Sequence, residues 1–153
     1  MSHIGKILAA LAFSKYSPAI FEYSSRLAME LNAMLLVAHI INIRDVEAIS
    51  SVESLGYSVS TDDYIKGVKE ERMAELEKII AEGPLPRDKI KILIKVGHPF
   101  DALMKIINEE GVDMAVIGTK GRSDLEHVML GSVAEKIIRH SPIPVLSYPT
   151  KRH

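Results

Sequence analysis

Short apolar runs that alternate with amphipathic stretches constrain the fold of this chain more than any other feature. The runs cover residues 4–13, 34–43, 90–96, 114–117 and 145–146. Most of them have the length of a strand, and the first two carry few polar residues, as expected of strands covered on both faces. Between the runs, apolar residues recur every three or four positions, which is typical of helices with one buried face. We therefore expect five strands connected by four helices.

This order of elements predicts an α/β fold. Strands that alternate with helices favour parallel pairing through right-handed crossovers. We expect a three-layer α/β/α sandwich around a five-stranded parallel sheet, which is a Rossmann-like arrangement. The chain has 153 residues, with no internal repeat and no linker that divides it. A single domain over residues 1–153 is therefore predicted.

Three further features of the pattern predict local structure. Residues 44–60 have no apolar period, and we predict a mobile surface loop there. Ser60, with Asp63 three residues later, resembles a capping box that opens a helix. His39 lies inside an apolar run, so we expect a hydrogen-bonded core residue. Lysines alternate with apolar residues at the start of 90–96, which indicates a strand near the sheet edge.

The composition excludes several classes of function. Nineteen Lys and Arg against 20 Asp and Glu leave a net charge of −1, which provides no general attraction for nucleic acid or anionic membranes. The absence of cysteine excludes disulfides, thiol catalysis and cysteine-ligated metals, and favours a cytoplasmic location. No apolar run reaches the roughly 18 residues of a membrane span. Residues 7–13 are short for the core of a signal peptide, and a buried strand is the favoured interpretation.

One strand-to-helix connection carries the strongest chemical signal. Gly118, Gly121 and Gly131 lie on it, and Ser132 opens the following helix. Glycines let backbone N–H groups approach an anion closely, and a helix N-terminus supplies unpaired donors with a partial positive charge. Ser132 and Glu135 also fit a capping box, so a purely structural helix cap is the alternative. The segment matches neither the P-loop nor the dinucleotide-binding glycine pattern.

Gly118-Thr-Lys-Gly121, nine further residues and then Gly131-Ser132 follow the pattern G-x2-G-x9-G-[ST]. This resembles the nucleotide-binding motif of the universal stress protein family, in its ATP-binding branch, and the resemblance extends over essentially the whole chain. It implies a fold of the adenine nucleotide alpha hydrolase-like type and a homodimer joined through the C-terminal strand. It also implies that ATP or a related adenine nucleotide binds and that the protein acts as a stress-response switch.

The resemblance also implies roles for individual residues. The phosphates would be held by Gly118, Gly121, Gly131 and Ser132, with the backbone of Val133 as a neighbour. The adenine would lie near the ends of the first two strands, at residues 10–12 and at Ile40.

One position departs from the family pattern. Ala12 stands where ATP-binding members carry an aspartate that contacts the nucleoside. Alanine cannot accept a hydrogen bond, and loss of a charge-assisted bond weakens binding by about 1.5–3 kcal/mol, or roughly tenfold to a hundredfold. The glycine spacing thus favours nucleotide binding, whereas Ala12 favours the alternative of a protein-interaction module with a vestigial nucleotide site. In that alternative, residues 44–60 present the surface for a protein partner.

Catalysis is a separate question. Hydrolysis of ATP requires a positioned water, neutralised phosphate charge and usually a metal ion. Lys120 and Arg122 could screen the phosphates, and Asp124, Glu126 and His127 could orient water or Mg²⁺. Nothing in the pattern determines where these side chains point, so we assign neither a catalytic residue nor a metal site. We expect at most slow ATP hydrolysis, with any Mg²⁺ carried in by the phosphates.

Overall fold

A computed structural model describes residues 3–120 and 131–150 of the chain. It contains one five-stranded sheet with the strand order β3-β2-β1-β4-β5, and all four pairings are parallel. The strands are β1 (Lys6–Ala10), β2 (Met34–Asn42), β3 (Ile90–Gly97), β4 (Met114–Gly118) and β5 (Val145–Tyr148). The predicted parallel α/β fold is confirmed, and so is the placement of the predicted strand 90–96 at a sheet edge.

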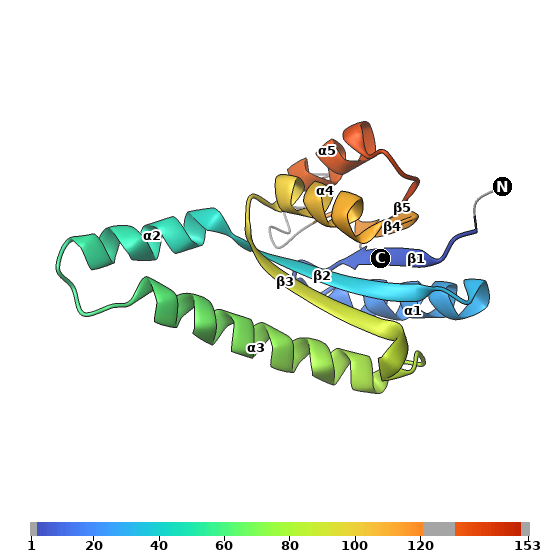
Figure 1. The fold of residues 1–153 in the computed structure, drawn as a ribbon, viewed down its shortest axis with the longest axis horizontal. Helices are drawn as coiled ribbons and strands as arrows, with labels where there is room; N and C mark the ends of the chain where they lie inside the picture. Colours follow the sequence, from blue (N-terminus) through green and yellow to red (C-terminus); the bar gives the residue numbers. More distant parts are fainter. Residues whose placement is uncertain (1–2, 121–130, 151–153) are drawn as a thin grey trace.

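Helices cover both faces of this sheet and complete a three-layer sandwich (Figure 1). One face carries α1 and α3, and the other carries α4 and α5. The helices are α1 (Ser17–Leu31), α2 (Ile43–Ser54), α3 (Thr61–Glu82), α4 (Pro99–Glu110) and α5 (Ser132–His140), with a short 3-10 helix at Arg87–Lys89.

The alternating direction of strand side chains explains why the apolar runs are continuous. In β1, Ile7 and Ala9 pack in the layer of α1 and α3, whereas Leu8 packs in the layer of α4 and α5. Successive side chains of a strand point to opposite faces, so a central strand covered on both sides needs apolar residues at every position. The sheet is therefore visible in the sequence as uninterrupted apolar runs.

The predicted loop at 44–60 is wrong, because most of it forms the helix α2, and the described residues hold five α-helices where four were expected. The side chain of Asn42 caps α2 by accepting a hydrogen bond from the N–H of Arg44. Val46 is the one buried residue of α2, since this helix packs on α3 and scarcely touches the core. A helix with so little buried surface needs no apolar stripe, which is why the pattern did not reveal it.

The connection between α2 and α3 is held by polar contacts. The Glu53 carboxylate accepts hydrogen bonds from the Thr61 hydroxyl at 2.6 Å and from its N–H at 3.2 Å, which lowers the pKa of Glu53. The Ser60 hydroxyl accepts a hydrogen bond from the N–H of Asp63 at 3.2 Å, so the predicted cap at the start of α3 is confirmed.

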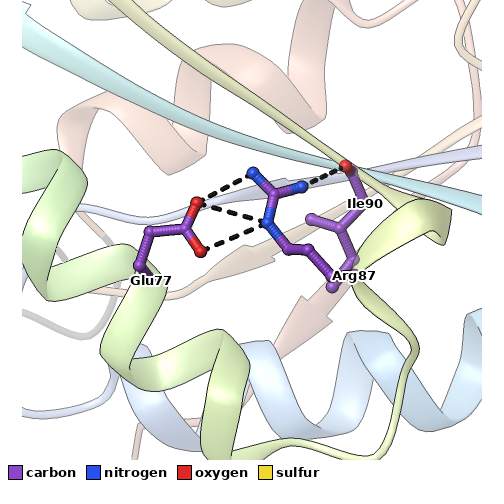
Figure 2. Close-up of polar contacts among 3 residues, drawn as sticks. All are labelled: Glu77, Arg87 and Ile90. Carbon is purple, nitrogen blue, oxygen red and sulfur yellow. Dashed lines mark hydrogen bonds and ion pairs between the residues drawn. The ribbon is translucent and has the colours of Figure 1, made fainter.

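Near its other end, α3 is tied to the start of β3 by Arg87 (Figure 2). The guanidinium of Arg87 donates to the Glu77 carboxylate at 2.8–3.2 Å and to the carbonyl of Ile90 at 2.8 Å. These hydrogen bonds lower the pKa of Glu77 and raise that of Arg87. Together with buried Leu76 and Ile80, they set the position of α3 against the sheet.

Candidate functional site

A cavity of about 660 Å³ lies at the carboxyl ends of β1, β2 and β4, where parallel α/β sheets bind ligands. Its volume lies within the range of small-molecule sites. Six of the seven residues predicted to bind nucleotide line it: Ala12, Ile40, Gly118, Gly131, Ser132 and Val133. The seventh, Gly121, lies outside the described residues, as do Arg122, Asp124, Glu126 and His127.

At one end of the cavity, the start of α5 supplies backbone donors. Gly131 is the N-cap residue, and its N–H donates to the carbonyl of Thr119 at 2.7 Å, which fixes the turn before the helix. Its carbonyl accepts from the N–H of Glu135, which is the first bond of the helix. The N–H groups of Ser132 and Val133 precede that bond and have no acceptor within the helix. They give the cavity wall a partial positive charge suited to an anion.

The alternative interpretation of Ser132 as the capping residue of a capping box is wrong. Ser132 is the first residue of α5, and Gly131 occupies the N-cap position from which a side chain would have to cap the helix. The Ser132 hydroxyl makes no hydrogen bond to any part of the chain that the structure describes. It lines the cavity and remains available to a ligand.

Gly118, at the end of β4, lines the cavity and also lets a neighbouring helix pack closely against this strand. A Cβ built on Gly118 would lie 2.7 Å from Cδ1 of Ile20, so its absence lets α1 approach the end of this strand. The next residue, Thr119, is held by a 2.7 Å hydrogen bond between its hydroxyl and that of Thr150. The strand end that leads toward α5 is therefore fixed by contacts from both α1 and the segment after β5.

The ends of β1 and β2 are joined by a buried histidine. Nδ1 of His39 lies 2.8 Å from the carbonyl oxygen of Leu11. A carbonyl can only accept, so Nδ1 carries the proton. The prediction of a hydrogen-bonded core histidine is confirmed. The ring of Phe13 meets that of His39 edge-to-face at 4.5 Å, while Ala12 lines the cavity and offers no acceptor side chain.

Part of the cavity wall was missed by the sequence patterns. Tyr64, Val68 and Arg72 from α3 and Asp45 from α2 also line it. One signal was present: Arg72 lies four residues after Val68 and four before buried Leu76, so a cation interrupts an apolar stripe of α3. A charged residue is rarely found on the buried face of a helix unless it is paired with another polar or charged group.

Across 3–120 and 131–150, no group of three or more His, Cys, Asp or Glu side chains is placed to hold a metal ion. Within the same residues, no helix has the length and apolar character needed to cross a membrane.

Comparison with known proteins identifies relatives over nearly the whole length. The chain matches the universal stress protein family over residues 3–149. It is 28% identical over 149 residues to the universal stress protein MJ0577 of Methanocaldococcus jannaschii, and the alignment covers 92% of each chain. It is 29% identical over 143 residues to the universal stress protein YxiE of Bacillus subtilis, covering 92% of this chain and 96% of the relative.

Solved structures of related proteins share the fold of this chain. The structure of the hypothetical protein MJ0577 superposes with a TM-score of 0.78 at 27% identity and covers 99% of this chain and 100% of its own. The universal stress protein UspA from Lactobacillus plantarum shares the fold with a TM-score of 0.71 at 19% identity, covering 96% and 99%. The family match extends from residue 3 to residue 149, and a solved structure of a relative shares the fold. This chain therefore belongs to the universal stress protein family.

Proposed function

We propose that this protein binds ATP or a related adenine nucleotide in the cavity at the ends of β1, β2 and β4. The observation that carries the proposal is the convergence of Ala12, Ile40, Gly118, Gly131, Ser132 and Val133 on one cavity of about 660 Å³. These residues come from four separate stretches of the chain, and a shared cavity gives them a common ligand.

In this proposal the phosphates lie against the start of α5. The N–H groups of Ser132 and Val133 and the Ser132 hydroxyl donate to phosphate oxygens, and the helix N-terminus favours their negative charge. Lys120 also lines the cavity and adds a positive charge. Because the net charge of the chain is −1, the attraction for an anionic ligand has to be local. Mg²⁺ would enter with the phosphates, since the described residues offer no acidic cage for it.

The nucleoside lies between residues 10–12 and Ile40. Apolar lining residues such as Leu11 and Ile40 suit the faces of a purine ring. A universal stress protein that shares this fold, with a TM-score of 0.62 at 22% identity over 98% of this chain, was solved in complex with cAMP. That protein holds an adenine nucleotide, which supports the same ligand class here.

Calorimetry with ATP and Mg²⁺ tests the proposal. The expected result is saturable heat of binding to the folded protein, together with adenine nucleotide recovered from protein purified without added ligand. No heat at millimolar ATP, with circular dichroism showing a folded chain, would refute it.

We also propose that the protein is a homodimer joined through β5 and that nucleotide switches its state in a stress response. β5 is an edge strand that pairs with β4 alone among the described strands, so its other side has free backbone groups. Light scattering with and without ATP tests this arrangement. A monomer under both conditions would contradict it.

The alternative function is a protein-interaction module with a vestigial nucleotide site. The observation in its favour is the connection after α2, where Leu55 is 75% exposed and Tyr57 is 67% exposed, far from the sheet (Figure 1). The variant Ala12→Asp separates the two functions by adding a carboxylate to the cavity. ATP affinity that is already present in the wild type supports nucleotide binding, whereas affinity that appears only in Ala12→Asp supports the interaction module.

We also propose that this protein hydrolyses ATP slowly at most. The test is phosphate release by the wild type and by Gly131→Val, which fills the space before α5. Release that persists unchanged in Gly131→Val would come from a contaminating enzyme.

A further inference from the structure

Arg72 is a cation in the cavity wall that the fold leaves partly unsatisfied. Its side chain is only 16% exposed, and its Nε is buried without a hydrogen-bond partner. The carboxylate of Glu75 lies 3.8 Å from its terminal nitrogen, which is too long for a hydrogen bond. Asp45 also lines the cavity, and no ion pair joins it to Arg72 in the part of the chain that the structure describes.

The guanidinium is nevertheless held in a defined position. Its central carbon lies 4.8 Å from the centroid of the Phe13 ring, which is a cation–π contact. Phe13 adopts a left-handed backbone conformation, with a φ of 56°, and its ring packs edge-to-face on the buried ring of His39. The platform beneath Arg72 is thus fixed from the ends of β1 and β2.

Packing alone does not account for an arginine at this position. Val68 and Leu76 lie one turn before and one turn after it on the same stripe of α3, and an apolar residue at 72 would continue that stripe. A buried N–H group without an acceptor lowers stability. Nε itself is closed to solvent, but Arg72 lines the cavity, and an anion that reaches the guanidinium from the cavity explains why the cation is there.

We infer that Arg72 binds an anionic group on the nucleoside part of the ligand, so that the cavity selects adenine nucleotides phosphorylated on the ribose 2′ or 3′ oxygen as well as at the 5′ position. This inference rests on the proposed nucleotide binding. The start of α5 receives one phosphate, and the planar fork of Arg72 receives the other, because guanidinium groups bind phosphate through paired hydrogen bonds. Ala12 adds no carboxylate to the cavity, and Asp45, which does line it, makes no ion pair with Arg72 in the described residues.

The test compares three ligands by calorimetry: AMP, adenosine 2′,5′-bisphosphate and adenosine 3′,5′-bisphosphate. The wild type is expected to bind one of the bisphosphates about tenfold to a hundredfold more tightly than AMP, which is the range for a charge-assisted contact. The preferred isomer identifies which ribose oxygen carries the phosphate.

Variants of two arginines assign this preference to its source. In Arg72→Met the preference for the bisphosphate should disappear, while the melting temperature stays the same or rises because methionine continues the apolar stripe. Arg72→Lys keeps the charge without the fork and should retain part of the preference. The matched control is Arg26→Met: Arg26 is exposed on α1 and pairs with Glu22 at 3.2 Å, so its loss should leave the preference intact.

Two results would overturn the inference while nucleotide binding stands: equal affinity of the wild type for AMP and both bisphosphates, or a preference that survives in both Arg72→Met and Arg72→Lys. A lower melting temperature of Arg72→Met with an unchanged preference would show that Arg72 serves packing alone. If the folded wild type binds neither ATP nor any of the three ligands, the proposed function itself fails and this inference falls with it.

Discussion

The two ends of the cavity are built in different ways. The α5 end, lined by Gly118, Gly131, Ser132 and Val133, presents the backbone N–H groups of Ser132 and Val133, whose direction is set by the start of one helix. The α3 end, formed by Tyr64, Val68 and Arg72, presents side chains that depend on how a long helix lies against the sheet. An anion site made of backbone tolerates changes in most side chains, whereas a site made of packed side chains changes with each of them. In the proposed nucleotide site, the α5 end suits a ligand group common to all nucleotides, and the α3 end suits the group that distinguishes one from another.

Weakening the packing of α3 against the sheet should disrupt the α3 end of the cavity. It should also have the largest effect on the stability of the fold. Leu76 is fully buried between α3 and the sheet, and Leu76→Ala should lower the free energy of unfolding by about 2–5 kcal/mol. Urea denaturation measures the change. Met73→Ala on the exposed side of the same helix is the control, with an expected change within about 0.5 kcal/mol. Equal effects of the two substitutions would show that α3 does not depend on its buried stripe.

Filling the α5 end should have the largest effect on nucleotide affinity. Gly131 lies directly before α5 with φ −69° and ψ 153°, a conformation open to any residue, so Gly131→Val should fold. The added side chain occupies the space in which phosphate approaches the N–H groups, and the affinity for ATP should fall at least about tenfold, or about 1.4 kcal/mol. Calorimetry measures it.

A glycine elsewhere provides the matched control for this prediction. Gly67 lies on α3, and a Cβ there would meet no atom within 4 Å. Gly67→Val should therefore leave the affinity for ATP unchanged. The same loss of affinity in both variants would place the phosphates away from the start of α5.

Two serines at the starts of helices separate ligand binding from helix capping. Ser132→Ala removes a hydroxyl that bonds to nothing in the described residues, so it should weaken ATP binding roughly threefold to tenfold with almost no change in stability. Ser60→Ala removes the cap of α3 and should lower the free energy of unfolding by about 0.5–2 kcal/mol without affecting ATP. Calorimetry and urea denaturation of both variants check this. The reverse pattern would mean that Ser132 serves the helix and not the ligand.

The smallest predicted effect concerns the ion pair that ties α3 to β3. Arg87 lowers the pKa of Glu77 in the folded protein, so the pair stabilises the fold above the ordinary glutamate pKa of 4.5. That stabilisation is lost as the pH falls through the lowered folded value. Both side chains are about half exposed, so solvent screening limits the effect of Glu77→Gln at pH 7 to less than about 1 kcal/mol.

The measurement is the difference in unfolding free energy between the wild type and Glu77→Gln at pH 7 and at pH 3. The difference should shrink at the lower pH, because the charge of the pair is lost as the pH falls through the lowered pKa of Glu77. A difference that is the same at both pH values would show that the contact in Figure 2 does not stabilise α3 through charge.

The described elements show which parts of the fold could be predicted. The strands were found because a covered strand is apolar at every position, and the cap at Ser60 was found because its bond spans only three residues. The helix α2 was missed because it buries only Val46 and begins with a cap at Asn42 rather than with an apolar stripe. The cap at Ser132 was placed one residue too late, since Gly131 takes the N-cap position with no side chain to reveal it.

The sequence by itself determined the parallel α/β sandwich and the α5 end of the cavity. Both follow from local rules: the period of apolar residues, the spacing of glycines and the geometry of a helix start. Only the tertiary structure decided that α3 would bring Arg72 onto the ring of Phe13 and into the same cavity. That meeting joins residues far apart in the chain, and it depends on the packing of α3 through Leu76 and on its tie to β3 through Arg87. No local pattern encodes such a contact, because its energy arises only when the layers of the sandwich come together.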